Sequence, residues 1–172
     1  AAQTAALMPR DFDGHARLAQ TRMLGCFALM LGFDGPVELP FDAALVRDST
    51  LSWISVNHSK PGRSDSSTLV ALASNAWSED HLDTRLDAVL GDMREELDRV
   101  LGRSLPAARM ADVHRWRYAN IPTQPGERSL LDARNRLGAC GDWCVYGRVE
   151  GAFLSATDLA ERLLPLLAGR PG

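Results

Sequence analysis

The sequence lacks the glycine patterns that hold the phosphates of nucleotides. No two glycines stand two residues apart, which excludes a Gly-x-Gly-x-x-Gly fingerprint, and there is no Gly-Lys-Ser or Gly-Lys-Thr phosphate loop. The Gly-x-Ser-x-Gly elbow of serine hydrolases is missing as well. No two histidines are spaced as His-x-x-x-His, so we expect no metal site. These absences leave neither a complete dinucleotide-binding motif nor a hydrolytic one in this chain.

Lysine, cysteine and long apolar runs are also scarce. Lys60 is the only lysine, so arginine accounts for 18 of the 19 basic side chains; the net charge of −3 predicts no binding of nucleic acid. No apolar run is long enough to cross a bilayer, and the first residues show no signal segment, so we expect no membrane association. Three cysteines, an odd count, argue against a disulfide framework. We therefore expect reduced thiols and a cytoplasmic location.

What is present suits a single domain over residues 1–172. A hydrophobic content of 45% in a chain of this length is enough for a proper core. Apolar stretches separated by short turns predict strands, and short loops favour antiparallel pairing. We therefore predict an α+β fold with a mixed, largely antiparallel sheet of about five to seven strands flanked by helices. The expected strands are 23–33, 41–47, 51–57, 68–76, 109–119, 130–133 and 137–140, and short helices are expected at 3–8 and 14–22.

A long amphipathic pattern covers residues 78–101. Ser78 suits a helix N-terminus, because its hydroxyl can accept a backbone N–H and acidic residues follow in the first turn. Apolar residues then recur at helical spacing as far as Leu101, with charged residues on the opposite face. Gly102 is the expected C-terminal cap. The pattern predicts one helix with a solvated face.

Residues 137–164 predict a strand, a glycine-rich turn and a helix. Gly141 and Asp142 end the strand, and from Val149 apolar residues recur at helical spacing in one stripe. The first N–H groups of a helix have no intrahelical partner and carry partial positive charge, so such an end suits a phosphate or a developing anion. Asp142 can accept hydrogen bonds from ligand hydroxyls. An ordinary strand-to-helix turn is the alternative interpretation.

Two polar groups are candidates for contact with a substrate. His114, Trp116 and Tyr118 alternate along one expected strand and therefore share one face of a sheet. The aromatic pair suits a flat ligand, and plain core packing is the alternative. His58 and Lys60 stand in a loop that follows an earlier strand, where they suit an anionic group or are simply solvated charges. No residue is singled out as a catalytic base.

Three stretches of the chain together resemble the FAD-dependent amine oxidases, and more closely their renalase-like branch. The most specific stretch is Gly141-Asp142-Trp143 followed by Gly147-Arg148-Val149-Glu150-Gly151-Ala152 and Ser155. The other two are Asn57–Arg63 and His114–Ala119, in the same order as in that branch. Ala156 departs from the pattern, since many relatives have glycine after the serine. The resemblance covers most of the chain.

The resemblance implies a cofactor, FAD, and a set of contacts to it. The residues that it assigns to the cofactor are Gly141, Asp142, Trp143, Arg148, Val149, Glu150 and Ala152. The residues that it assigns to the substrate are Trp116 and Tyr118, with His58 and Lys60. The family's N-terminal glycine fingerprint is missing, so we expect a fragment: a substrate-domain portion at 1–133 and a last FAD-contacting piece at 134–172. Such a fragment should bind FAD weakly or not at all.

Two functions stay open at this point. In the first, the chain is part of an FAD-dependent oxidoreductase that oxidises a small amine or a reduced ring by hydride transfer to flavin. The cofactor performs that chemistry, and the protein supplies orientation and electrostatics. In the second, the chain is a stand-alone, non-enzymatic module that binds a hydrophobic ligand or partner through the aromatic sheet face. A fragment would also expose an apolar face, through which we expect a homodimer.

Overall fold

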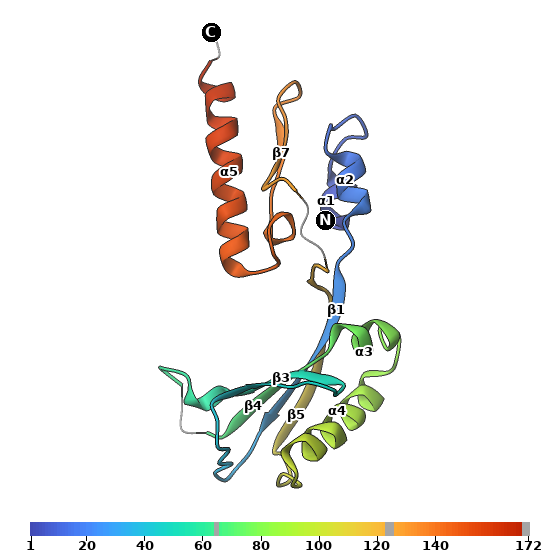
Figure 1. Ribbon diagram of the computed structural model, residues 1–172, viewed down its shortest axis with the longest axis vertical. Helices are drawn as coiled ribbons and strands as arrows, with labels where there is room; N and C mark the ends of the chain where they lie inside the picture. Colours follow the sequence, from blue (N-terminus) through green and yellow to red (C-terminus); the bar gives the residue numbers. More distant parts are fainter. Residues whose placement is uncertain (64–65, 123–125, 170–172) are drawn as a thin grey trace. The chain divides into compact units, whose positions relative to one another are not determined.

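The computed structural model describes residues 1–63, 66–122 and 126–169 (Figure 1). The chain divides into two compact units: unit 2 is Gly25–Tyr118, and unit 1 is formed by Ala1–Leu24 together with the residues from Ala119 onward. The divisions fall within two strands. They do not coincide with residue 133, where the sequence suggested a change from substrate domain to FAD-contacting piece, and that assignment of roles stays a prediction.

Unit 2 is built on a five-stranded sheet with the strand order β2-β3-β4-β1-β5. The neighbours β2 and β3, β3 and β4, and β4 and β1 pair antiparallel. This confirms the predicted α+β class with a largely antiparallel sheet. The elements are β1 Leu24–Gly32, β2 Ala43–Leu45, β3 Leu51–Val56, η1 Asn57–Ser59, β4 Thr68–Ala73, α3 Asn75–Asp80, α4 Leu86–Leu101 and β5 Met110–Asn120.

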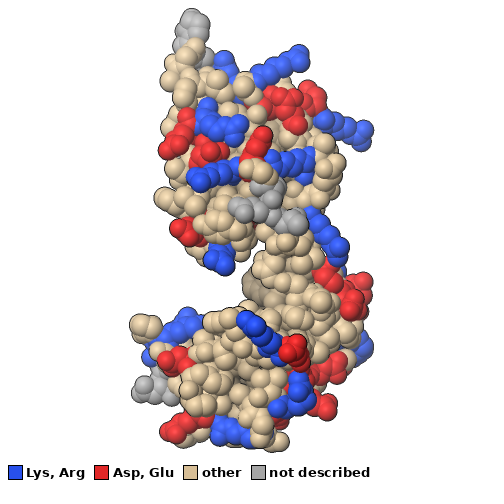
Figure 2. Space-filling view, viewed as in Figure 1, with Lys and Arg blue, Asp and Glu red and all other residues tan. Residues whose placement is uncertain are grey.

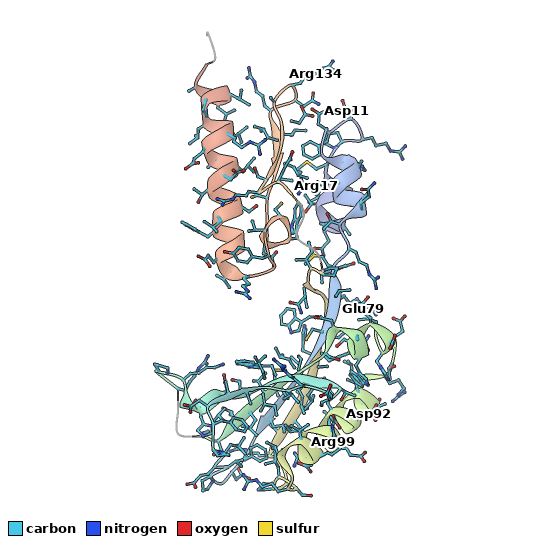
Figure 3. The ribbon with its side chains drawn as sticks, viewed as in Figure 1. Asp11, Arg17, Glu79, Asp92, Arg99 and Arg134 are labelled. Carbon is cyan, nitrogen blue, oxygen red and sulfur yellow. The ribbon has the colours of Figure 1, made fainter. Side chains whose placement is uncertain are left out.

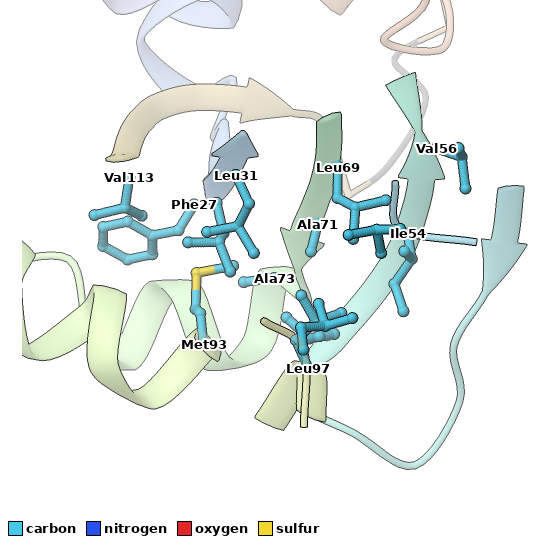
Figure 4. Packing of buried hydrophobic residues seen from close by; sticks show 14 of the residues in the cluster. Phe27, Leu31, Ile54, Val56, Leu69, Ala71, Ala73, Met93, Leu97 and Val113 are labelled. Atoms are coloured by element: carbon cyan, nitrogen blue, oxygen red, sulfur yellow. The ribbon is translucent and has the colours of Figure 1, made fainter. Parts of the chain in front are cut away.

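One face of this sheet forms the core of unit 2 against helix α4 (Figure 4). Val89, Met93 and Leu97 recur along α4 at helical spacing, and all three are fully buried. Strand residues that alternate along the chain meet them, because successive side chains of a strand point to opposite faces. The sheet's contribution to this core includes Phe27, Leu29, Leu31, Leu51, Ile54, Val56, Leu69, Ala71, Ala73 and Val113.

The predicted single helix over 78–101 is wrong, because the segment forms two helices. Ser74, not Ser78, caps α3: its hydroxyl accepts the Trp77 N–H at 3.3 Å. Ser78 lies inside α3 and is fully buried, and its Oγ accepts the Phe27 N–H at 3.3 Å. Ser78 has the hydroxyl that a capping residue needs, but it uses that hydroxyl to bind a neighbouring strand. Gly102 does end α4 in the left-handed region, at φ 66°.

The connection between α3 and α4 is held by arginines of β5. Arg115 donates to the Thr84 carbonyl, and Arg117 pairs with Asp83 at 3.0 Å. In the last turn of α3 itself, the Glu79 carboxylate accepts the Gly25 N–H at 2.6 Å, at the start of β1 (Figure 3). Helix α3 and the connection that follows it are therefore fixed to strands that are distant in sequence.

The described part of unit 1 contains a two-stranded hairpin, three α-helices and one short 3-10 helix. The hairpin strands pair antiparallel, from Leu130 with Ala139 to Asp132 with Leu137. The expected strands at 130–133 and 137–140 and the helix from Val149 are thus confirmed. The elements of unit 1 are α1 Ala2–Leu7, α2 His15–Gln20, β6 Leu130–Asp132, β7 Leu137–Ala139, η2 Asp142–Cys144 and α5 Val149–Ala168.

Helix α5 fully buries only small residues, Gly151 and Ser155. A Cβ atom at Gly138 of β7 would lie 2.5 Å from Leu159 Cδ1, so the glycine makes room for the half-buried Leu159 side chain of the helix. Much of the apolar stripe that the sequence shows is exposed, including Val149, Phe153, Leu164 and Leu167. Among the described residues, no helix is long and apolar enough to span a bilayer.

Glu96 on α4 joins the helix to the turn before β3. Arg99 donates to both of its carboxylate oxygens at 2.6 Å, and the Ser49 hydroxyl and Thr50 N–H also donate to it. The Arg99 hydrogen bonds, aided by the other donors, lower the pKa of Glu96 to about 2. A carboxyl group whose pKa is lowered on folding stabilises the folded state above its unfolded pKa.

We predict that this stabilisation is lost on acidification. The wild type should lose unfolding free energy, relative to Glu96→Gln, as the pH falls from about 4.5 through about 2, because Glu96 binds a proton more readily when unfolded. Urea unfolding over that pH range measures the difference. Asp92→Asn, an exposed site on the same helix (Figure 3), is the control. If Glu96→Gln and wild type keep a constant difference across the range, the assigned pKa is wrong.

A second prediction concerns packing within α4. Met93→Ala should lower the unfolding free energy by about 2–5 kcal/mol, since it leaves a cavity under the sheet. Gly91→Ala, two residues away, should raise it by about 0.5–1 kcal/mol, because nothing lies within 4 Å of the added methyl group and alanine favours helix. Chemical denaturation of the two variants should give opposite signs.

Candidate functional site

The turn that precedes α5 is built around a buried indole. Trp143 is 6% exposed and packs in the core of unit 1 with Phe12, Leu18 and Leu130. A Cβ atom at Gly141 would overlap the Nε1 and Cδ1 atoms of this indole. Glycine is therefore required at 141 by space and not by its backbone angles, since its φ of 164° is extended. Trp143, a predicted cofactor contact, lies in the core of unit 1.

Ser155 fixes the turn to helix α5 from inside the unit. Its Oγ accepts the Gly141 N–H at 3.0 Å and donates to the Arg128 carbonyl at 2.5 Å. Its side chain is fully buried, so these bonds are not shared with solvent. The sequence places Ser155 in a motif but does not reveal this role, because the partners come from separate segments.

Asp142 shapes the turn with its backbone as well as its side chain. Its carbonyl accepts the N–H groups of Val145 and Gly147, both at 3.0 Å. Its Oδ1 accepts the Trp143 N–H at 2.9 Å. Within the described residues, no hydrogen bond is recorded for Oδ2. The carboxylate is half-buried and retains one oxygen for a ligand donor.

The N-terminus of α5 has no side-chain cap. Arg148 occupies the N-cap position with extended angles, φ −132° and ψ 160°, and its side chain makes no capping bond. Its guanidinium lies 5.8 Å from the centre of the Tyr146 ring instead. Val149 is 91% exposed, and Glu150 is exposed beside it. The bond from the Ala152 N–H to the carbonyl of Arg148, the N-cap residue, measures 3.1 Å and is the first of the helix. The N–H groups that precede it remain available to a ligand.

Glu150 influences the nearest phenol. Burial, and then a hydrogen bond to the Glu150 carboxylate, raise the pKa of Tyr146. Glu150 also adds a negative charge to the first turn, which the helix dipole favours. The predicted cofactor residues thus gather at one turn and helix end, with all but Trp143 at least partly accessible.

The aromatic candidates of unit 2 stand on the edge strand β5. Trp116 and Tyr118 are each 54% exposed, so the prediction that they share an accessible sheet face agrees with the structure. The His114 ring contacts Trp116 edge-on, with ring centres 4.3 Å apart. Val113, which directly precedes His114 and lies on the opposite face of the strand, points into the core.

His58 and Lys60 are engaged by their own neighbourhood. The Nδ1 atom of His58 lies 3.1 Å from the backbone nitrogen of Thr68 and 3.2 Å from its carbonyl oxygen, so the ring pairs with the backbone of β4. Lys60 Nζ donates to Asn57 Oδ1 at 2.8 Å on the surface. These bonds stabilise the short helix η1 against β4.

The structure does not bring the two substrate groups together. Thr68, which holds His58, pairs with Gly32 at the end of β1, and a Cβ atom at Gly32 would lie 3.6 Å from Met110 Cβ. Trp116 is six residues further along β5, beside Gly25, which is about 20 Å at the rise of a strand. His58 and Lys60 therefore mark one end of the sheet, and Trp116 and Tyr118 mark the other.

Asp132 was not a predicted functional residue, and the structure buries it. It is 1% exposed and accepts the Asn135 N–H at 2.9 Å and the Asn135 Nδ2 group at 2.8 Å. The Asn135 bonds keep its pKa below the usual range. Aspartate three residues before asparagine between two strands was the available signal for this turn. The residue shapes the hairpin.

A polar pocket of about 330 Å³ lies between α2, β6 and α5 in unit 1. Its two arginines already have acidic partners: Arg17 lies 3.3 Å from Glu127, and Arg162 lies 3.4 Å from Asp158. Charges of both signs are similarly interspersed on the drawn surface (Figure 2). Both arginines among the described residues that line the pocket are thus already paired with carboxylates.

The thiols and acidic groups do not form a metal site in the described part of the chain, where no cluster of His, Cys, Asp or Glu could hold an ion. Burial raises the pKa of the Cys26 and Cys144 thiols. Both cysteines are buried and free. A raised pKa reduces the fraction of reactive thiolate.

We predict different outcomes for two glycine substitutions at the site. Gly141→Ala should lower the stability of unit 1 by about 1–3 kcal/mol, because the new methyl group displaces the buried indole. Gly151→Ala should be tolerated, since its methyl group would meet Tyr146 and Val145 at an ordinary 3.5 Å. The near-ultraviolet circular dichroism of the protein during chemical denaturation measures both. Equal stability of the two variants would contradict the packing described for Gly141.

Comparisons with known proteins bear on the family and the fold of the chain. The family model of flavin-containing amine oxidoreductases matches residues 4–164. Among solved structures, the chain resembles a protein assigned as a protoporphyrinogen oxidase from Exiguobacterium sp. 255-15, with a TM-score of 0.55 and 16% identity. The match covers 97% of this chain and 32% of that one, so the chain spans about a third of its structural relative. At this identity the likeness concerns the fold. The family match covers most of the chain, which therefore belongs to the flavin-containing amine oxidoreductase family.

Proposed function

We propose that this chain is part of an FAD-dependent oxidoreductase that oxidises a small amine or a reduced ring. The observation that carries the proposal is the N-terminus of α5, which has no side-chain cap and lies within the stretch that matches the family. Unit 1 supplies contacts to the cofactor, and unit 2 supplies a surface for the substrate. When bound, the flavin accepts a hydride, and the protein orients the reactants.

The residues at the turn fit one edge of a flavin. The N–H groups of Val149 and Glu150 belong to exposed residues, come before the first intrahelical bond and are available to a carbonyl oxygen of the ring. The position before them is occupied by Arg148, whose guanidinium is turned onto Tyr146 and not onto the helix end. A ligand can therefore replace the missing cap.

The helix end would favour the reduced cofactor. Reduction by two electrons leaves negative charge at the N1–C2=O edge of the ring, and a helix N-terminus stabilises nearby negative charge by about 0.3–2 kcal/mol. About 1.4 kcal/mol corresponds to about 30 mV for a two-electron couple. The expected shift in potential is thus at most some tens of millivolts. The negative charge of Glu150, at the same end of the helix, opposes part of this stabilisation of the reduced flavin.

Asp142 is proposed to act separately from the helix end. Its Oδ1 supports the turn through the Trp143 N–H, which leaves Oδ2 to accept a hydroxyl of the cofactor's ribityl chain. Such a bond to a charged acceptor contributes about 1.5–3 kcal/mol. It affects how tightly the cofactor is held much more than its potential.

The stand-alone binding module is the second candidate. It is favoured by the exposure of Trp116 and Tyr118, which would serve a hydrophobic ligand with or without flavin. Anaerobic mixing separates the two functions. If the whole flavoprotein bleaches its flavin with an amine or a reduced ring, the enzyme is supported; if it retains no flavin, the binding module is favoured.

We predict that removing one N–H from the helix end lowers the flavin potential. Val149→Pro removes a donor at the first helical position, where proline fits, and Arg148 before it already has the extended angles that proline requires. The potential of the bound flavin in the whole protein should fall by up to some tens of millivolts. Val149→Ala keeps the N–H and is the matched control. Equal potentials in the proline and alanine variants would contradict the assignment.

A further prediction separates Asp142 from the helix end. Asp142→Ala should weaken FAD retention about tenfold or more and leave the potential nearly unchanged, because it removes an acceptor and not a donor to the ring. Asp142→Asn keeps an oxygen for the Trp143 N–H and controls for damage to the turn. Dialysis followed by an absorbance scan measures retention. Full retention of FAD by Asp142→Ala would rule out this role.

A further inference from the structure

The first turn of α5 contains one carboxylate that is able to close the end of the helix. In the described part of the chain, the N-cap residue Arg148 makes no capping bond, and its guanidinium has only donors. Glycine at 151, the third helical position, excludes the capping box, in which a glutamate or glutamine at that position reaches back to the N-cap. Glu150 is the acidic residue of the first turn. Its carboxylate is therefore the acceptor within this turn for the exposed N–H groups of Val149 and Glu150.

The ring of Tyr146 lies against the same turn. A Cβ atom at Gly151 would lie 3.5 Å from Cδ2 of Tyr146 and 3.5 Å from its backbone nitrogen, so the half-buried phenol runs beside the helix where glycine leaves room. Gly147, in the left-handed region at φ 61°, turns the chain between the ring and the helix. The ring also packs against the core of unit 1 that contains Trp143. It is therefore held by packing as well as by the charged residues beside it.

Both charged side chains of the helix end are engaged by Tyr146. The Arg148 guanidinium lies 5.8 Å from the centre of the ring, within the range of a cation–π contact. The Glu150 carboxylate accepts a hydrogen bond from the phenol hydroxyl. Burial, and next this bond and the charge of Glu150, raise the pKa of Tyr146, while the charges of Arg148 and Arg128 act in the opposite direction. The carboxylate is thus bound to the phenol, at the side of the helix end.

We propose that Tyr146 is a positioning residue, which keeps the N-terminus of α5 open for the cofactor by holding the Glu150 carboxylate. This role rests on the proposed function, in which the same helix end binds the flavin. A helix N-terminus attracts negative charge, so a released Glu150 would turn onto the free N–H groups and compete with the flavin for them. The phenol hydroxyl prevents that competition. Tyr146 acts through Glu150 and not on the reacting atoms.

Tyr146→Phe tests this role, because it keeps the ring and removes the hydroxyl. In the whole flavoprotein, retention of FAD during dialysis should weaken about two- to tenfold, the effect expected when a self-capping side chain competes with the ligand. Glu150→Ala removes the competitor, so the double variant Tyr146→Phe/Glu150→Ala should retain FAD as well as Glu150→Ala alone. Glu161→Ala removes an exposed carboxylate about three turns further along α5 and should leave retention unchanged.

The contact between the two side chains is measurable without flavin. The chain has two tyrosines, so Tyr118→Phe leaves Tyr146 as the single phenol. In this background, Glu150→Ala should lower the pH at which the phenol ionises, because it removes a hydrogen-bond acceptor and a negative charge beside the hydroxyl. The absorbance of the tyrosinate during an alkaline titration of the full chain measures the change. Glu161→Ala is again the control and should not move the titration.

Three results overturn the proposal. A titration that Glu150→Ala does not move removes the contact on which the role depends. Full retention of FAD by Tyr146→Phe shows that the hydroxyl has no such role. A loss of FAD that persists in the double variant shows that Tyr146 acts through packing and not through Glu150. A wild-type flavoprotein that holds no FAD overturns the proposed function and this role with it, and the wild type alone distinguishes that failure from the other three.

Discussion

The candidate flavin site depends on one buried hydroxyl, that of Ser155. It accepts the Gly141 N–H and donates to the Arg128 carbonyl, and thereby joins α5, the end of β7 and the segment before β6. Trp143 fills the space beneath the same turn. With both in place, the helix begins at Val149 with its first N–H groups accessible. The accessible helix end thus depends on the packing of Ser155 and Trp143 against the turn.

Unit 2 uses its sheet in two ways. One face carries alternating apolar residues that pack on Met93 and Leu97 of α4 and supply the stability of the unit. The other face uses the residues in between, and those on the central strands are small or apolar without a covering helix in this unit. Because side chains alternate along each strand, the same residues that build the core determine which residues are left for a ligand.

Three elements were predictable from the sequence: the hairpin, the strand with Trp116 and the helix from Val149. In each, the local spacing of apolar residues and turn residues agrees with the structure that forms. The helix over 78–101 was not. Ser78 satisfies a strand N–H 51 residues away, while Ser74 caps the helix. The apolar stripe of α5 likewise suggested its packing side, yet the fully buried residues of the helix are Gly151 and Ser155, while Val149 and Phe153 of the stripe are exposed.

The sequence by itself determined the α+β class, the strand–turn–helix at 137–164 and the residues that resemble a flavin motif, since periodicity and glycine position are local properties. Tertiary structure decided the rest. It buried Trp143, engaged His58 with β4, and separated His58 from Trp116 by about 20 Å along the sheet. Those outcomes depend on register and on which segments meet, and neither is written in the spacing of residues along one stretch of chain.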